Sequence, residues 1–416
     1  MIGTLRKLHR AGDGLAADAG LYLVGAGFAG FTAAASTLPA HRAWGQIAVV
    51  GYAVAAVLAA VQLLGPAWLR TAPVRAAVLG IGWIGSTLLP LVVQAVQRAG
   101  GHPYRAQEEV AVVEMGATRL LDSGTPYLTR DAIAVAPEPL LGYLPYQPGM
   151  TVFGLPRALA GDVWWADARI WFALGTGAAL LAALRLLHTS GVRPTLLVRA
   201  AQAITVLPIC ALTLATGGDD LPVLALTLLA LAFAAQQRWT GAGVAIGAAA
   251  ALKLFAWPVA VVLVIYGYAQ SRQAGTRLAL PAVAILVGVL LPVTLRGGGA
   301  VAENLVRFPL GMGLVKSPAA SPFPGHLIAT GLPFGRAVAA TLLVAAAVAI
   351  GVWLLRRPPD TVGATAGVCA LGLLVAILLM PATRFGYLLY PAGYAVWAVA
   401  LGQLVGTREP LVPSKV

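Results

Sequence analysis

The chain has 416 residues, of which 59% are hydrophobic and only 10% are charged. Soluble globular proteins carry about 25% charged residues, and the mean hydropathy of +0.84 points away from them as well. These values exclude a water-soluble enzyme, a disordered chain and a disulfide scaffold, and they predict a polytopic membrane protein. In such a protein a net charge of +13 reports orientation and contact with anionic lipids more readily than nucleic-acid binding.

The first apolar run extends from Gly20 to about Leu38 and follows a basic N-terminus. It is too long for a signal peptide and another run follows at once, so we expect a retained first helix. The later runs of spanning length are 46–64, 75–97, 166–187, 195–215, 221–236, 241–269, 278–295, 336–355, 361–380 and 385–405. Because ~20 apolar residues cross a bilayer, these runs predict an all-α protein with about 11–12 transmembrane segments, forming one integral membrane domain over residues 1–416.

The run at 241–269 is interrupted by Lys253 and Pro258. It predicts either two short helices that meet near Lys253 at the outer side or one long tilted helix. Arg238 and Arg272 flank the run, and basic loops tend to lie on the cytoplasmic side. The two arginines favour two crossings, because a single crossing would place them on opposite sides of the membrane.

Basic residues gather in alternate short loops, which is the positive-inside pattern. It predicts that both termini are cytoplasmic and that two long connections, at about 98–165 and 296–335, lie outside. The inner basic residues are Arg6, Lys7, Arg10, Arg70, Arg75, Arg193, Arg199, Arg238, Arg272, Arg277, Arg356, Arg357, Arg408 and Lys415. Of the 15 acidic residues, all but Asp13, Asp18, Asp360 and Glu409 fall on the outer side. This asymmetry indicates polar chemistry outside, or long loops that need solubilising charge.

Residue usage gives two further indications. The chain has 24 Arg but only four Lys, with heavy use of Ala and Gly, which is typical of a high-GC genome such as that of an actinobacterium. The two cysteines, Cys210 and Cys369, both lie in apolar runs and are interpreted as small buried hydrophobes. No disulfide, zinc or redox motif is present in the sequence.

The first long connection has its own pattern of helix and turn signals. From Glu108 to Asp122 the apolar residues recur at helical spacing, which predicts an amphipathic helix lying at an interface. The Ser-Gly-Thr-Pro-Tyr stretch at 123–127 is a turn that ends this helix. A Tyr- and Pro-rich segment at 143–161 suits irregular backbone followed by a short helix. Trp164 and Trp165 then mark the membrane interface before the next span.

Several charged residues elsewhere are candidates for a site. Asp219 and Asp220 start a helix, so they either cap it or bind acceptor hydroxyls or a divalent metal, although one dipeptide does not make a metal site. Lys253 lies inside an apolar run, where a charge is costly, so it either snorkels to the surface or faces an anion. The late outer segments add Arg307, Lys316, His326 and Arg384. Each is a rim charge, or together with Lys253 they form an anion site.

The motifs of the first loop resemble those of a known family. Tyr127 lies eighteen residues after Glu109, in a turn that also contains Gly124 and Pro126, and the Tyr-Pro-rich segment that contains Tyr146 follows. This order resembles the polyprenyl-phosphate-sugar-dependent glycosyltransferases of the GT-C fold. The particular pattern is similar to bacterial glycosyltransferase family 87, a mannosyltransferase-like integral membrane group. The family usually has a single Asp where this chain has the Glu108-Glu109 pair.

A second stretch carries the same resemblance. The family often has a Gly-rich helix followed by a Lys and, within a few residues, a Pro. Here Gly241, Lys253 and Pro258 follow Arg238 in that order. The resemblance implies that Lys253 is a cation facing a lipid-linked phosphate, and it extends over about residues 100–400 of the chain.

The resemblance implies transfer of a monosaccharide, such as mannose, from a polyprenyl-phosphate donor to a lipid or glycan acceptor on the outer face of the cell membrane. Transfer would invert the anomeric configuration, with a carboxylate as general base. The implied roles are general base for Glu109 or Glu108; donor phosphate binding for Lys253, Arg384, His326 and Arg307; and acceptor or sugar binding for Asp219, Asp220, Tyr127 and Tyr146. No cofactor, resident metal or nucleic acid is expected.

Two other classes of function remain open from the sequence. The number of spans and the positive charge also suit a transporter or flippase for a lipid-linked sugar or a small solute. Transporters place their polar groups near the bilayer midplane, often on broken helices, and the break near Lys253 resembles one. Against this reading, the acidic residues gather in an outer loop. The third class is a non-catalytic scaffold of an envelope-assembly complex.

Overall fold

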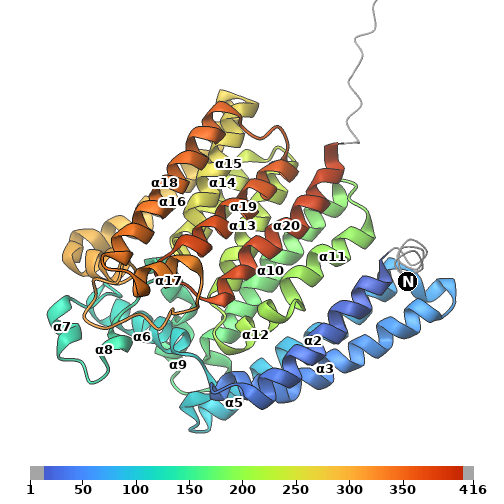
Figure 1. Ribbon diagram of the computed structural model, residues 1–416, viewed down its shortest axis with the longest axis horizontal. Helices are drawn as coiled ribbons and strands as arrows, with labels where there is room; N and C mark the ends of the chain where they lie inside the picture. The colour runs from blue at the N-terminus through green and yellow to red at the C-terminus, as the bar shows by residue number, and fades with distance from the viewer. Residues whose placement is uncertain (1–13, 406–416) are drawn as a thin grey trace, which may run out of the picture.

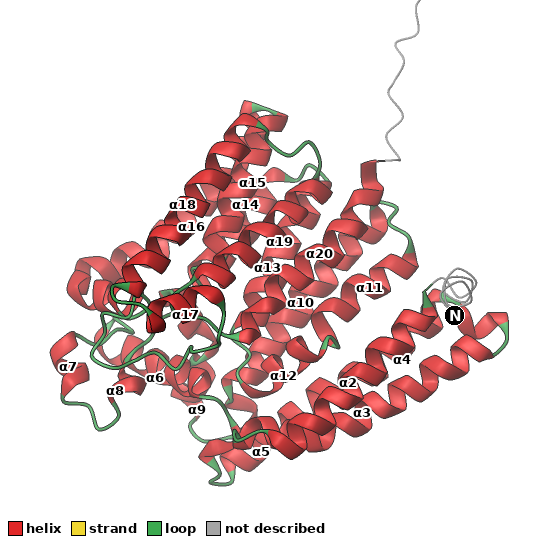
Figure 2. Ribbon diagram, viewed as in Figure 1, coloured by secondary structure: helices red, strands yellow, loops and turns green. Residues whose placement is uncertain are grey.

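The structure is a computed structural model that describes residues 14–405. Within this range the regular secondary structure is helical, apart from one isolated parallel bridge between Ala320 and Thr383 (Figure 2). The predicted all-α class is therefore confirmed. The charged residues expected near the two ends of the chain lie outside the described residues; they are Arg6, Lys7, Arg10, Asp13, Arg408, Glu409 and Lys415.

Eight helical units in the described range are long and apolar enough to cross a membrane. They are α2 (Leu15–Ala35), α3 (Pro39–Leu64), α4 (Ala72–Trp83) with α5 (Leu89–Ala99), α10 (Ala168–Thr189), α16 (Arg272–Ala302), α18 (Gly335–Arg356), α19 (Val362–Leu379) and α20 (Leu389–Gly402). The pair α11 (Pro194–Thr205) and α12 (Pro208–Thr216), bent by 46°, makes a ninth. Three shorter apolar helices, α13 (Asp220–Ala235), α14 (Trp239–Leu252) and α15 (Ala256–Gln270), cover the remaining apolar runs. The protein is a multi-pass membrane protein.

The helices α2, α3, α4 and α5 form an N-terminal unit along one side of the bundle (Figure 1). Small residues allow close approach within it, because a Cβ on Gly51 would lie only 2.3 Å from the carbonyl carbon of Gly85. The hydroxyl of Tyr52 donates a hydrogen bond of 2.9 Å to the carbonyl of Val206, at the bend between α11 and α12. This contact joins the N-terminal unit to the rest of the bundle.

The broken run at 241–269 forms two short helices, as the basic flanks predicted. Helix α14 ends at Leu252 and α15 begins at Ala256. The two helices are antiparallel, since the rings of Trp239 at the start of α14 and Tyr266 near the end of α15 lie 5.8 Å apart. The hairpin places Lys253 at its tip.

The first long connection runs from the end of α5 to the start of α10 and carries short helices of its own. They are α6 (Glu108–Ser123), α7 (Arg130–Ala134), α8 (Pro139–Gly142) and α9 (Leu155–Ala160). Helix α6 is the predicted amphipathic helix, with Val110, Val113 and Ala117 buried. Gly124 ends it in the left-handed conformation, with φ of 71°, where the turn signal predicted a stop.

The second long connection starts later than the sequence indicated. Helix α16 continues through a kink at Gly297 and passes into a π-helical turn at Glu303–Arg307. The prediction ended this helix near residue 295, where the apolar run ends; the three consecutive glycines that follow, at 297–299, are poor helix formers, and the kink lies at the first of them. The remainder of the connection contains α17 (Pro324–Gly331).

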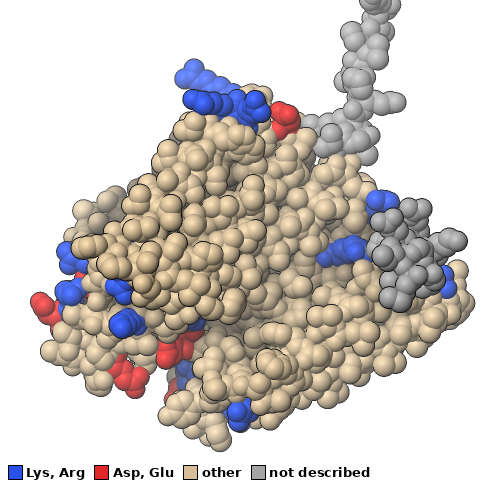
Figure 3. Space-filling view, in the orientation of Figure 1, with Lys and Arg blue, Asp and Glu red and all other residues tan. Residues whose placement is uncertain are grey.

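The short helices α6 to α9 and α17 gather at one end of the bundle (Figure 1). On the face shown in Figure 3, a broad uncharged surface covers the helices, and most Lys, Arg, Asp and Glu side chains lie toward the ends. A surface of this kind suits contact with the hydrocarbon core of a bilayer. The fold thus places the two long connections together, next to the tip of the α14–α15 hairpin.

Candidate active site

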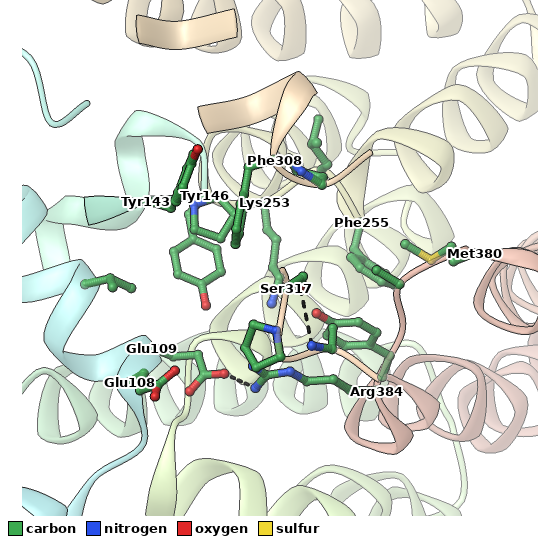
Figure 4. A pocket seen from close by; sticks show the side chains of 18 of the residues that line it. Glu108, Glu109, Tyr143, Tyr146, Lys253, Phe255, Phe308, Ser317, Met380 and Arg384 are labelled. Atoms are coloured by element: carbon green, nitrogen blue, oxygen red, sulfur yellow. Dashed lines mark hydrogen bonds and ion pairs between the residues drawn. The ribbon is translucent and has the colours of Figure 1, made fainter. Parts of the chain in front are cut away.

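A cavity of about 260 Å³ lies where the two long connections meet the tip of the α14–α15 hairpin (Figure 4). Its polar lining residues are Glu108, Glu109, Tyr143, Tyr146, Lys253, Ser317, Arg384 and Tyr387. Apolar residues of α15 and α19 line other parts of the wall, among them Pro258, Leu373 and Ala376. The cavity therefore offers both a charged surface and an apolar one.

Glu109 forms an ion pair with Arg384, which directly precedes the last helical segment (Figure 4). The Glu109 side chain is 12% exposed and that of Arg384 is 32% exposed. Glu108 and Glu109 open α6, where the helix dipole favours carboxylates. Since neighbouring helical residues point about 100° apart, Glu108 lies on a more exposed side of the same opening. Glu109 is the carboxylate of this pair that meets a cation.

Lys253 is held by two carboxylates that come from the start of α13. Its Nζ donates hydrogen bonds of 2.5 Å to Asp219 and 2.6 Å to Asp220. The three side chains are 8%, 5% and 7% exposed, in that order. A snorkelling Lys253 is therefore wrong for this structure. The capping interpretation of Asp219 is also wrong, because its side chain makes no capping hydrogen bond and contacts the lysine instead.

Aromatic rings complete the surroundings of the Lys253 ammonium. It lies 5.0 Å from the ring centre of Tyr146 and 5.3 Å from that of Tyr387. Tyr390 donates a hydrogen bond of 2.7 Å to Asp220, and its ring stacks on Phe255 at 5.0 Å. Such faces attract a cation through their quadrupoles. The cluster of Lys253, Asp219 and Asp220 is thus enclosed on several sides.

The other predicted site residues are dispersed. Tyr127 is buried, and its hydroxyl donates a 2.7 Å hydrogen bond to the carbonyl of Tyr146, so it supports the cavity wall from behind. His326 and Arg307 do not line the cavity. The ring of His326 bonds the carbonyl of Pro381 at 3.0 Å, and Arg307 is 55% exposed and pairs with Glu303.

A buried carboxylate that the sequence did not single out links the first long connection to the π-helical turn at the end of α16. Glu303 accepts hydrogen bonds of 2.9 Å from Arg130 and 2.8 Å from the hydroxyl of Tyr143. The ring of Tyr143 stacks on Phe308, with ring centres 4.1 Å apart. Because Tyr143 and Phe308 both line the cavity, this contact fixes part of its wall.

A second missed network anchors α6 to the start of α10. Arg98 donates to Glu114 at 2.6 Å and to Asp167 at 3.0 Å, and Arg169 donates to Asp167 at 2.8 Å. Although burial opposes ionisation of Asp167, the charges and hydrogen bonds of Arg169 and Arg98 hold the pKa of its carboxyl well below the ordinary value. No short sequence motif marks this network, because its members come from three separate segments.

The acid–base character of the cavity follows from these environments. Burial raises the pKa of Tyr146 well above its ordinary value, and the charge of Asp219 raises it further. Tyr146 is therefore a neutral hydroxyl rather than a base. Among residues 14–405 no cluster of three or more His, Cys, Asp or Glu side chains is arranged to hold a metal ion. Glu109 is the cavity carboxylate that forms an ion pair with Arg384.

Comparison with known proteins gives one family and two related structures. The model of "Glycosyltransferase family 87" matches residues 143–381. ArnT from Cupriavidus metallidurans bound to undecaprenyl phosphate aligns with 17% identity and a TM-score of 0.48, covering 83% of this chain and 61% of ArnT. Its apo state aligns with 16% identity and a TM-score of 0.47, covering 80% and 61%. This chain thus spans less than two thirds of ArnT. No curated protein matches the sequence.

Proposed function

The chain belongs to glycosyltransferase family 87, and from this premise we propose that it transfers a monosaccharide from a polyprenyl-phosphate donor to a lipid or glycan acceptor. The observation that supports this most is the contact of Glu109 with Arg384 inside a cavity that also has apolar walls. A donor of this kind combines a sugar, a phosphate and a hydrocarbon chain. Its three parts need polar groups, a cation and an apolar surface in one place.

The donor phosphate is bound by Arg384 in this proposal. A guanidinium matches the phosphate oxygens with two parallel hydrogen bonds. In the described structure Arg384 is occupied by the carboxylate of Glu109. A phosphate that binds Arg384 competes with this carboxylate, so that donor binding releases Glu109 for chemistry.

The released Glu109 acts as the general base. It takes the proton from an acceptor hydroxyl as the hydroxyl oxygen attacks the anomeric carbon. The bond between the anomeric carbon and the phosphate oxygen breaks, and polyprenyl phosphate leaves with the bonding electrons. Arg384 stabilises the charge that develops on this phosphate. Attack from the side opposite the leaving group inverts the configuration, and no covalent sugar–enzyme intermediate is required.

We assign Lys253 a different role from the phosphate binding that the family resemblance implied. Its ammonium already contacts Asp219 and Asp220, so the cluster holds one basic and two acidic side chains. Direct approach of a phosphate to this cluster is opposed by the two carboxylates. We therefore propose that Lys253 positions the tip of the hairpin and the rings of Tyr146 and Tyr387, and that Arg384 is the first phosphate ligand.

The identity of the sugar and the orientation of the protein in the membrane complete the proposal. Mannose is the proposed sugar, following the mannosyltransferase-like character of the family. The basic short loops of the sequence favour an outer position for the first long connection, residues 98–165, and for the second, residues 296–335. The active site then faces away from the cytoplasm, with both termini inside.

Purified protein in liposomes tests this function directly, with labelled polyprenyl-phosphate mannose as donor and envelope lipid extract as acceptor. Glu109→Gln is expected to lose ~10²–10⁴ in rate, the usual effect of removing a general base. Glu108→Gln is the matched control one residue away and keeps most activity. Glu109→Asp keeps a fraction, because the carboxylate remains. If both Gln variants transfer sugar at the wild-type rate, the mechanism is wrong and the transporter interpretation replaces it.

A further inference from the structure

Gln107, immediately before the two glutamates, connects three elements at the edge of the cavity. Its backbone N–H donates a 2.8 Å hydrogen bond to the carbonyl of Thr216, at the end of α12. Its side chain lies against Gly217, where a Cβ would come within 2.7 Å of the carboxamide oxygen. Gln107 occupies the N-cap position of α6, yet its side chain makes no capping bond to that helix.

The side chain of Gln107 bonds His41 instead. The carboxamide N–H donates a hydrogen bond to the Nε2 atom of His41, with the two nitrogens 2.6 Å apart, because an amide nitrogen acts only as a donor. His41 is the third residue of α3, in the N-terminal unit. It therefore approaches the site from a part of the chain that lies before residues 143–381, the segment that the family model matches.

Two independent contacts thus converge on the first turn of α6. Gln107 is fixed by His41 and α12, and Glu109, two residues later, is fixed by Arg384. In the proposed reaction Arg384 gives up Glu109 when the donor phosphate arrives. Once the Glu109–Arg384 pair is broken, the His41–Gln107 contact still holds the start of α6, and with it the position of Glu109.

We infer that His41 is a positioning residue for transfer: through Gln107 it holds the first turn of α6, so that Glu109 keeps its place after Arg384 has engaged the donor phosphate. The inference rests on the proposed function. A displacement of about 1 Å of a reacting group can cost ~10²-fold in rate. His41 contributes to the catalytic step in this way, rather than to donor binding.

A double-mutant cycle tests the inference in the liposome assay described above. His41→Leu is expected to lower kcat by roughly 10- to 100-fold while the KM for polyprenyl-phosphate mannose stays within about two-fold. His41→Gln places an amide close to the position of Nε2 and is expected to restore most of the rate. Gln107→Leu should resemble His41→Leu, and the double variant should be no slower than either single variant, because both remove the same contact.

His188, exposed at the end of α10, gives the matched control, and His188→Leu should leave both constants unchanged. Thermal melting of each variant in detergent checks the fold. Losses that multiply in the double variant would overturn the inference, as would a change in KM alone. If His41→Gln is as slow as His41→Leu, the ring itself is needed and the positioning role is wrong. A wild-type protein that transfers no sugar would overturn the proposed function together with this inference, whereas an active wild type with an unaffected His41→Leu overturns the inference alone.

Discussion

Replacing Lys253 by Met gives a sharp test of the buried cluster. The lysine side chain is 8% exposed, and the substitution keeps its volume while removing its charge. Asp219 and Asp220, 5% and 7% exposed, would then face each other without the cation that both contact. Removing one partner of a buried ion pair costs about 3–5 kcal/mol, because the remaining charge stays in a medium of low dielectric constant.

This loss is a large part of a typical stability of about 5–15 kcal/mol. Lys253→Met is therefore expected to lower both the yield of folded protein and its melting temperature in detergent. The matched variant carries Lys253→Met together with Asp219→Asn and Asp220→Asn. It removes all three charges, and neutral replacement of a whole buried ion pair is often close to neutral in stability. We expect it to recover most of the lost melting temperature.

Polyprenyl-phosphate binding separates the two roles of the lysine. If Lys253 only positions the hairpin tip, the neutral triple variant binds polyprenyl phosphate with an affinity close to that of the wild type in native mass spectrometry. A triple variant that melts normally but has lost this binding would show that the ammonium holds the phosphate. A Lys253→Met protein as stable as the wild type would refute the energetic argument.

Three further outcomes are expected. Arg384→Gln should abolish polyprenyl-phosphate binding, whereas Arg384→Lys should keep part of it, because a lysine keeps the positive charge but cannot make two parallel hydrogen bonds to the phosphate. Unchanged binding in both variants would remove Arg384 from the phosphate site. A cysteine at the exposed Ser123 should react with an impermeant maleimide in intact cells, and a cysteine at the exposed Asp360 should react only after permeabilisation. The native cysteines are buried, so they should add little background labelling. The reverse labelling result would invert the orientation. Tyr127→Phe should lose about 1 kcal/mol of stability with the 2.7 Å bond to Tyr146, measured by melting, and change the rate little; a dead enzyme would place Tyr127 in the chemistry.

Features written in short stretches of sequence were predictable. The amphipathic period of α6, its stop at Gly124 and the break at Lys253 are local patterns, and the structure confirms all three. The family expected from the loop motifs is also confirmed. The end of α16 was placed too early, because the chain becomes helical again after the non-helical kink at Gly297.

Pairings between distant segments were not predictable in the same way. Lys253 was interpreted as a snorkelling residue or as a cation facing a lipid-linked phosphate, although its partners Asp219 and Asp220 had themselves been identified as candidates. The missing information was that α13 and α14 are antiparallel neighbours, which brings the start of one to the end of the other. Glu303 was missed for a related reason, since its hydrogen-bond partner Tyr143 lies 160 residues earlier in the chain.

The two cations of the cavity differ in how fully they are already neutralised. Lys253 is shared by two buried carboxylates, so a phosphate would have to displace both while remaining close to their charge. Arg384 is shared with one carboxylate and is more exposed, so a phosphate can take its place with less loss. The carboxylate displaced from Arg384 is Glu109, which is the base in the proposed reaction. In the proposed mechanism the base therefore becomes available only when a donor phosphate occupies Arg384. Without a donor, Glu109 stays paired with Arg384 and does not take a proton from an acceptor hydroxyl.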